Sequence, residues 1–201
     1  MKWIASLLVY LAVGIGVFQF HNAWGALLGF HAAILISLLI ARPNIPISIL
    51  FKSQNIKWII LSILLCGSSG VTLYFLWNQF GVVSDITKQT ESFGLNPQTW
   101  LPFLIYFALV NPFVEEYFWR GYLGSPTKTL YPSDFLYAGY HGLILLGKVQ
   151  IGMIMYSLGA LILAGWLLRQ IAREDQGLLA PLLGHMAADL TILTTIYIKI
   201  H

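Results

Sequence analysis

The sequence predicts an all-α fold: a polytopic transmembrane helix bundle with about seven membrane helices. Apolar residues make up 58% of the 201 residues and charged residues only 9%, and the mean hydropathy is +0.75. A soluble domain carries roughly a quarter charged residues, so most of this surface is expected to face lipid. The chain also divides into apolar runs of membrane-spanning length. Its tryptophans lie at or near the ends of these runs, as is typical of residues at a membrane interface.

The apolar runs place each predicted helix. The expected spans are residues 3–20, 24–40, 58–77, 100–122, 133–146, 151–168 and 178–198. Residues 43–57 form a polar, proline-containing connection with a short interfacial piece at residues 47–51, and residues 78–99 form the longest polar loop. Segment 133–146 is short for a span, and a re-entrant helix at this place would leave six spans.

Basic residues outside the spans predict the orientation, because cytoplasmic loops carry an excess of lysine and arginine. Three basic residues fall on the side opposite the amino terminus: Lys88, Lys148 and Lys199. Seven fall on the side of the amino terminus: Lys2, Arg42, Lys52, Lys57, Lys128, Arg169 and Arg173. This bias places the amino terminus in the cytoplasm and the carboxyl terminus outside. It also favours a full crossing by residues 133–146, because a re-entrant segment would move Arg169 and Arg173 to the other side.

Charge and cysteine content exclude two kinds of protein. The net charge of +3 is small and scattered, so no nucleic-acid partner is expected. The single cysteine, Cys66, rules out an internal disulfide framework. It lies in an apolar run, where a free thiol is usually a small buried packing residue.

Ionisable residues in the apolar segments are the candidate functional site. We treat residues 1–201 as one transmembrane domain, and these residues all lie within residues 100–201. Charges at membrane depth cost several kcal/mol and are functional candidates by default. The set is Glu115, Glu116, Arg120, His141, His185 and Asp189.

Helical spacing gives the two adjacent glutamates different directions. Glu116 and Arg120 are four residues apart, so they share a helix face and can pair. Glu115 is rotated by about 100° from Glu116 and points elsewhere. One glutamate can therefore be held by the arginine while the other addresses a cavity. The alternative is a solvated helix end in the headgroup region, since arginine side chains snorkel.

Two histidines extend the candidate site. His185 and Asp189 share a face at a spacing of four, where the carboxylate can orient the imidazole, or both can bind a metal or a developing oxyanion. A structural polar pair between helices is the alternative. In the predicted orientation Glu115, His141 and His185 lie about 10–12 Å from the same membrane face. His31 has no carboxylate neighbour at helical spacing, so we expect it to be a packing or interfacial residue.

This set of residues permits hydrolysis by activated water. Glu115, with His141 beside it, can deprotonate a water aimed at a peptide carbonyl. His185, oriented by Asp189, can stabilise the oxyanion. No serine or cysteine has a base at helical spacing, and the HExxH metalloprotease spacing is absent from the sequence.

Three short motifs carry a family resemblance. Glu115-Glu116-Tyr-Phe-Trp-Arg120 matches the EExxxR signature of the CPBP intramembrane proteases. These are the CAAX prenyl endopeptidases and bacteriocin-processing proteins, also called the abortive-infection family. Tyr137-Ala-Gly-Tyr-His141 resembles the second motif, FxxxH, and His185-Met-Ala-Ala-Asp189 resembles the third, HxxxN/D. All three occur in family order on apolar helices, and they cover roughly the carboxyl-terminal half of the chain.

The resemblance implies a role for each motif residue. Glu115 takes the position of the water-activating glutamate, with His141 beside it and His185 and Asp189 on the oxyanion side. It further implies that Glu116 and Arg120 are structural or orienting residues, and that an all-helical bundle has a cleft reached from the cytosol. The expected location is a prokaryotic cell membrane.

This chain also departs from the family pattern. Tyr137 replaces the usual phenylalanine, Trp119 precedes the arginine where phenylalanine is common, and Asp189 leaves the third motif without an amide donor. The aspartate would then act through His185 or a metal. The stretch between the first two motifs is short, so a tight loop is expected.

The expected activity is endopeptidase cleavage near the cytoplasmic membrane face, on a hydrophobic or lipidated peptide or protein surrounded by membrane lipids. The metal question stays open: Glu115, His141, His185 and Asp189 are candidate zinc ligands, and a mechanism without metal is equally compatible. Two other classes remain as alternatives. One is a proton- or ion-coupled transporter that uses the ionisable cluster as a relay. The other is a non-catalytic immunity or scaffold protein.

Overall fold

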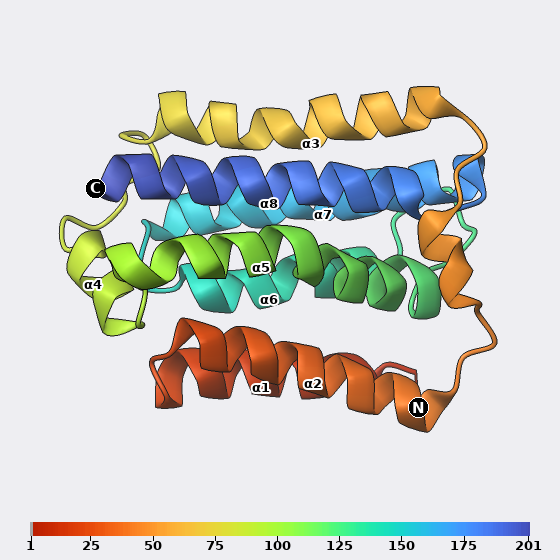
Figure 1. The fold of residues 1–201 in the computed structure, drawn as a ribbon, viewed down its shortest axis with the longest axis horizontal. Coiled ribbons are helices and arrows are strands. Elements are labelled where there is room, and N and C mark those ends of the chain that lie inside the picture. Colours follow the sequence, from red (N-terminus) through yellow and green to blue (C-terminus); the bar gives the residue numbers. More distant parts are fainter. Residues whose placement is uncertain (1) are drawn as a thin grey trace.

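Helices form all the regular structure in residues 2–201, the part of the chain that the computed structural model describes (Figure 1). The predicted all-α fold is confirmed. In chain order the helices are α1 (Ile4–Gly14), continued by the π-helical η1 (Ile15–Gln19), α2 (Ala23–Ala41), the 3-10 helix η2 (Ile47–Phe51), α3 (Ile56–Leu76), α4 (Ile86–Ser92), α5 (Pro97–Glu116), continued by the π-helical η3 (Tyr117–Tyr122), α6 (Pro132–Leu145), α7 (Ile151–Asp175) and α8 (Leu179–Ile200).

Each of the seven predicted segments is a helix, but two details differ from the expectation. The predicted polar loop at residues 78–99 contains helix α4, which hydropathy does not reveal because its residues are mostly polar. Ile86 attaches this helix to the apolar cluster around Trp100. Helix α7 continues to Asp175, beyond the predicted limit at residue 168, because its last turns leave the apolar stretch and bind polar loops.

The long helices run back and forth along one axis, so the two termini lie at opposite ends of the bundle (Figure 1). Helix α6 crosses as well. The loop after it reaches the carboxyl-terminal end, where the Val83 amide donates to the Lys148 carbonyl at 3.1 Å. At that end Thr87 also donates to the Ile200 carbonyl at 3.3 Å. Segment 133–146 therefore traverses the bundle and does not turn back on itself.

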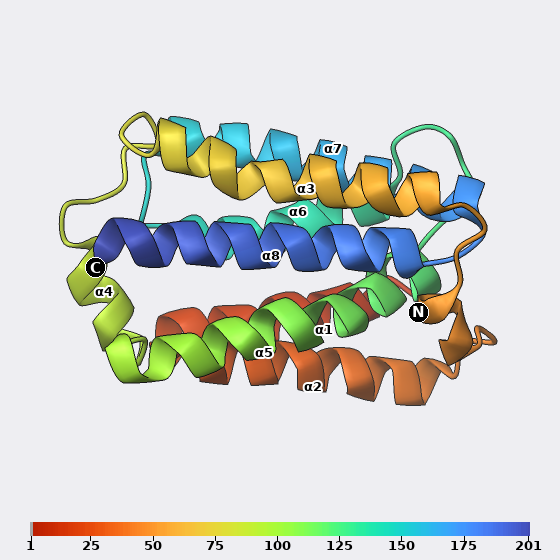
Figure 2. The same ribbon diagram turned by 45° about the horizontal axis from the view of Figure 1, so that its top comes forward.

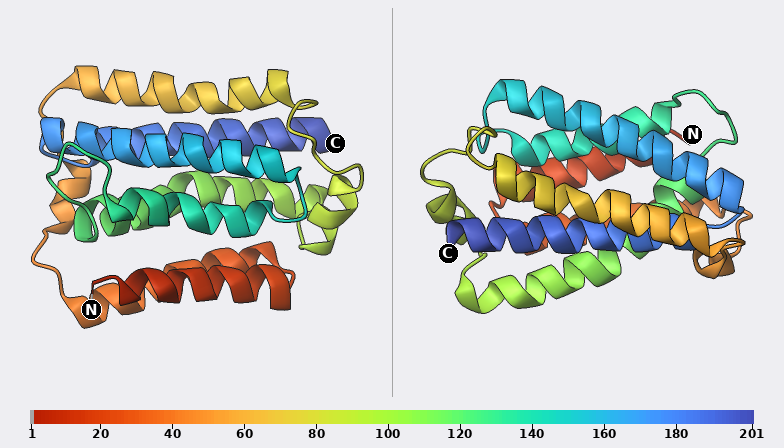
Figure 3. Two further views of the ribbon diagram at one scale, coloured as in Figure 1. Left: turned by 180° about the vertical axis from the view of Figure 1, so that it is seen from behind. Right: turned by 90° about the horizontal axis from the view of Figure 1, so that it is seen from above.

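The helices are arranged in tiers. In Figure 1, α1 and α2 form one side of the molecule, α5 and α6 lie next to them, α7 and α8 follow, and α3 covers α8. Figure 2 keeps α1 and α2 together beyond α5, and both views of Figure 3 keep α3 beside α8. In Figure 1 the motif-bearing helices α5, α6 and α8 thus lie between α1 and α2 on one side and α3 on the other.

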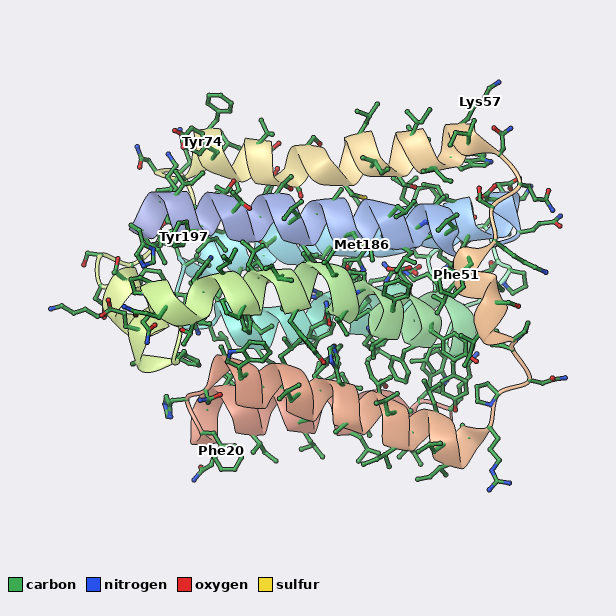
Figure 4. All side chains as sticks on the ribbon, viewed as in Figure 1. Phe20, Phe51, Lys57, Tyr74, Met186 and Tyr197 are labelled. Carbon is green, nitrogen blue, oxygen red and sulfur yellow. The ribbon has the colours of Figure 1, made fainter. Side chains whose placement is uncertain are left out.

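The distribution of polarity is that of a protein in lipid. Four helices, α2, α3, α7 and α8, are long and apolar enough to cross a membrane. Leu39, Phe75 and Ile151 are each at least 71% exposed on the outside, whereas Glu116 and Asp175 are completely buried. Figure 4 shows Tyr74 and Tyr197 toward one end of the bundle and Lys57 and Phe51 toward the other. Large apolar side chains face outward along the long helices while several charged ones are buried, so this is an integral membrane protein.

Helices α3 and α8 approach closely through small residues. A Cβ atom on Gly70 would lie 2.3 Å from the backbone carbonyl carbon of Thr191, and one on Gly184 would lie 2.8 Å from the Cβ of Ser62. The hydroxyl of Thr195 donates across the interface to the Gly70 carbonyl at 2.9 Å. Close packing of small residues and polar cross-links are the usual means of joining helices in a membrane.

Gly70→Ala should therefore destabilise the bundle. The added methyl group meets backbone atoms of α8 that cannot rotate away, and overpacking of this kind costs about 1–3 kcal/mol. Thermal unfolding in detergent should show a lower midpoint for this variant. Gly159→Ala in α7 is the matched control, since a Cβ there meets nothing within 4 Å. A Gly70→Ala protein as stable as the control would contradict the close approach.

Candidate active site

The first motif lies where α5 changes into a π-helix. Asn96 caps the start of α5, with Pro97 at the first helical position, so the helix begins at a defined residue. It ends at Glu116, and the π-helical segment η3 carries Arg120. π-helical turns are rare and frequently occur at functional sites. The structure places this one directly after the two glutamates.

Glu116 is the centre of a buried ionic cluster. Its Oε1 lies 3.1 Å from Nη1 of Arg120 and 2.7 Å from Nδ1 of His185. The Arg120 guanidinium also lies over the Tyr137 ring, 4.0 Å from its centroid. The predicted pairing of Glu116 with Arg120 is present. The contact with His185 is additional, and it joins the first motif to the third.

Glu115 points to a different set of partners. The side-chain amide of Asn111 donates to its Oε1 at 2.7 Å, and the Tyr140 hydroxyl donates to its Oε2 at 2.6 Å. The residue is only 2% exposed. The ring of Trp119 stacks on Tyr140, with centroids 6.0 Å apart and planes at 5°. The predicted divergence of the adjacent glutamates is therefore observed, and each carboxylate is held by its own donors.

His141 is half-buried, as is Asp189. Its Nδ1 lies 2.9 Å from the carbonyl oxygen of Tyr137, one turn back in the same helix. A carbonyl can only accept, so Nδ1 carries the proton and Nε2 is the basic nitrogen of the neutral ring. The His141 ring packs on Tyr140 at a centroid distance of 4.0 Å. Tyr140 thus touches both His141 and Glu115.

His185 and Asp189 share a helix face, as their spacing predicts, but they are not closely bonded. Nε2 of His185 lies 3.6 Å from Oδ1 of Asp189, whereas Nδ1 lies only 2.7 Å from Glu116. Glu116 therefore orients this ring more directly than Asp189 does. Oδ2 of Asp189 lies 3.4 Å from the Asn111 amide nitrogen. These contacts, together with the packing of His141 on Tyr140, bring all six predicted residues together.

Two residues at the site escaped the sequence analysis, and one was interpreted differently. Asn111 and Tyr140 hold Glu115, and Asn111 could have been suspected from its position four residues before that glutamate. His31 was expected to be a packing or interfacial residue. It is buried, but its Nε2 lies 3.1 Å from Oδ1 of Asn111 and its Nδ1 lies 3.1 Å from the Tyr106 hydroxyl. Both partners lie on α5. The spacing of residues within α2 does not reveal which other helix lies beside His31.

The loop between the first two motifs is tight, as its length predicts. Arg169 donates from Nε and Nη2 to the two carboxylate oxygens of Asp134, at 2.9 and 2.7 Å. It also donates to the carbonyls of Ser125, Thr127 and Thr129 at 3.1, 2.6 and 2.7 Å. Arg169 is only 3% exposed. Arg169, one of the basic residues counted outside the spans, therefore serves as an internal support for this loop.

The candidate zinc ligands, Glu115, His141, His185 and Asp189, do not form a ligand set. Within residues 2–201, no group of three or more histidine, cysteine, aspartate or glutamate side chains is arranged to hold a metal ion. Both oxygens of Glu115 and Nδ1 of His185 are already engaged by protein groups. The donors that are present serve one another, so the arrangement does not fit a tetrahedral zinc site.

Glu116→Gln should cost far more stability than a surface substitution of the same kind. It leaves the Arg120 guanidinium buried without its counter-charge, and breaking a buried pair costs about 3–5 kcal/mol. Glu174→Gln removes the carboxylate of the exposed pair with Arg173 and should cost less than about 1 kcal/mol. Thermal unfolding of both variants in detergent tests this difference. Equal losses would show that the Glu116 pair contributes little.

Residues 97–191 match a protein family described as Type II CAAX prenyl endopeptidase Rce1-like. The matched segment contains all six predicted site residues. No curated protein and no solved structure matches the chain. The resemblance indicated by the three motifs is confirmed over this segment: residues 97–191 are similar to the Rce1-like proteins, in agreement with the CPBP family.

Proposed function

We propose that this protein is an intramembrane endopeptidase in which Glu115 activates a water molecule for attack on a peptide carbonyl. The observation that carries the proposal is the environment of Glu115: a deeply buried carboxylate that accepts two hydrogen bonds, next to a half-buried histidine. The family match over the same residues supports a protease of the CAAX type. It favours this chemistry over a transporter relay or a non-catalytic scaffold.

Glu115 remains able to bind water although both of its oxygens have partners. A carboxylate has about four lone-pair positions, and Asn111 and Tyr140 use two of them. The two donors also hold the carboxylate in one orientation. His141 presents its basic Nε2 from the adjacent helix, so a water between the two side chains would have an acceptor on each side.

The reaction then follows from these positions. The water oxygen bonds to the carbonyl carbon as Glu115 takes the water proton, and the carbonyl oxygen becomes an oxyanion. His185 is the proposed donor to that oxyanion: as an imidazolium it donates from Nε2 to the oxyanion while its Nδ1 donates to Glu116. Cleavage of the carbon–nitrogen bond returns the proton from Glu115 to the leaving amine. No covalent intermediate with the protein forms.

Glu116 and Arg120 act as supports in this proposal. Arg120 lies 3.1 Å from Glu116 and packs on Tyr137, while Glu116 orients His185. Neither side chain is needed as a proton carrier. Their contribution is to keep His185 in a single orientation, which is how groups around a catalytic residue usually affect the rate.

The proposed substrate is a hydrophobic or lipidated peptide or protein. The catalytic groups lie inside a bundle whose outer surface is apolar and surrounded by membrane lipid. His141 is the tenth residue of α6 and His185 the seventh of α8, so they lie about 9–14 Å from the helix starts. A segment that cannot partition into this region would not reach the water at Glu115.

Glu115→Gln should abolish cleavage without unfolding the protein. The amide keeps the shape of the side chain but cannot accept the water proton, and loss of a general base costs about 10²–10⁴-fold in rate. The assay uses purified protein in liposomes with a library of prenylated and unprenylated membrane peptides. Equal cleavage by wild type and variant would remove Glu115 from the mechanism.

A chelator arm of the same assay tests the metal question. Since the donors at the site engage one another, we expect cleavage to persist after treatment with a zinc chelator. Loss of wild-type cleavage on chelation, restored by added zinc, would contradict this expectation. The Glu115→Gln protein provides the background rate in both conditions.

We also propose that the amino-terminal end of the bundle faces the cytoplasm. Without the buried Arg169, the count of basic residues is six on this side against three on the other. Lys128 and Lys88 are exposed at opposite ends. In a Cys66→Ala background, Lys128→Cys should react with an impermeant maleimide only in inside-out vesicles, and Lys88→Cys only in right-side-out vesicles. The reverse pattern would invert the topology.

A further inference from the structure

A chain of hydrogen bonds that begins and ends on α5 passes through the amino-terminal half of the protein on its way to Glu115. It passes from Tyr106 to His31 in α2, then to Asn111, and it ends at the Glu115 carboxylate. His31 lies outside the family-matched residues 97–191. We infer that His31 and Asn111 are positioning residues that hold Glu115 in its working orientation. This inference rests on the proposed function of Glu115.

The direction of the chain follows from the chemistry of its last link. The Glu115 carboxylate can only accept, so the Asn111 group 2.7 Å from it must be the amide nitrogen. A flipped Asn111 would bring two oxygen atoms to that distance. The other end of the amide, Oδ1, then faces Nε2 of His31 at 3.1 Å. An amide oxygen accepts, so Nε2 of His31 must carry a proton.

The remaining ring nitrogen of His31 meets a hydroxyl group that can complete the chain. With the proton on Nε2, the neutral imidazole accepts at Nδ1 from the Tyr106 hydroxyl at 3.1 Å. Each group in the chain therefore donates in the same direction, toward Glu115. The geometry predicts one tautomer of His31 and one orientation of Asn111. A histidine that only filled space would have no reason to meet both conditions.

Burial makes this arrangement hard to replace. Asn111 is 1% exposed and His31 is 5% exposed, so water cannot substitute for a lost partner. A buried polar group without a partner is costly, so each hydrogen bond in the chain makes its neighbour more favourable. The Asn111 nitrogen also lies 3.4 Å from Asp189. One amide thus lies between the proposed base on α5 and the third motif on α8.

A purely structural tie between α2 and α5 is the competing explanation, and kinetics separate the two. A positioning role acts on Glu115 through Asn111, so it should lower kcat while KM changes little. The effect of His31 on kcat should also disappear when the Asn111 side-chain amide is absent. A structural tie would lower stability instead, and its effect would not depend on Asn111.

The experiment is a double-mutant cycle on cleavage of a membrane peptide in liposomes. His31→Phe and Asn111→Ala should each lower kcat by about 10- to 100-fold, in the range seen for groups that orient catalytic ligands. The double variant should be no slower than Asn111→Ala alone, because His31 acts through that amide. His31→Gln should recover part of the rate, since its amide nitrogen can donate to Asn111.

Ser37→Ala is the matched control in α2. Ser37 is buried, but it donates only to the Ala33 carbonyl of its own helix, so kcat should not change. Unchanged kcat in His31→Phe, or losses that multiply in the double variant, would overturn the positioning role while leaving Glu115-dependent cleavage intact. Absence of Glu115-dependent cleavage in the wild type would instead overturn the proposed function.

A second measurement does not depend on activity. Nitrogen-15 NMR of histidine-labelled wild-type protein reports the tautomer of each ring, and the spectrum of His31→Gln assigns the His31 signals. The expected state is protonated at Nε2 and unprotonated at Nδ1. A His31 ring with its proton on Nδ1 alone would overturn the directed chain, whatever the kinetics show.

Discussion

The burial of Glu116 between Arg120 and His185 is the constraint on which the rest of the site depends. The carboxylate is completely buried, and the arginine and histidine meet it from two different helices. Taking charges out of water is costly unless each is paired, so the three groups are stable only when α5, η3 and α8 are assembled. This requirement couples the fold of the bundle to the geometry of the site.

The two adjacent glutamates show how one helical turn can support different roles. Glu116 accepts from cationic or ring nitrogen donors, whereas Glu115 accepts from the neutral donors Asn111 and Tyr140. The helical rotation of about 100° per residue sends neighbouring side chains to different partners. A carboxylate engaged by an arginine and a histidine serves as a support, and one held by neutral donors keeps the ability to take a proton.

The amino-terminal helices contribute more than a covering for the motif-bearing half. Helix α2 brings His31 to Asn111, and helix α3 packs against α8 through Gly70 and Gly184. Both contacts reach helices that carry the site. In a lipid environment, where apolar contacts between helices gain little over contacts with lipid, close packing and internal hydrogen bonds provide much of the specificity. These residues therefore restrict how the site helices can move.

Hydropathy and spacing in the sequence were enough to determine the all-α fold, the seven helical segments, the different directions of Glu115 and Glu116, and the three motifs. These features are local, since they follow from apolar length and from the 3.6-residue period. The tertiary structure decided which donors meet each carboxylate. It brought His31 to Asn111, Tyr140 to Glu115 and Arg169 to Asp134. Each of these contacts joins residues on different helices, and spacing within a helix carries no information about which distant helix will lie beside it.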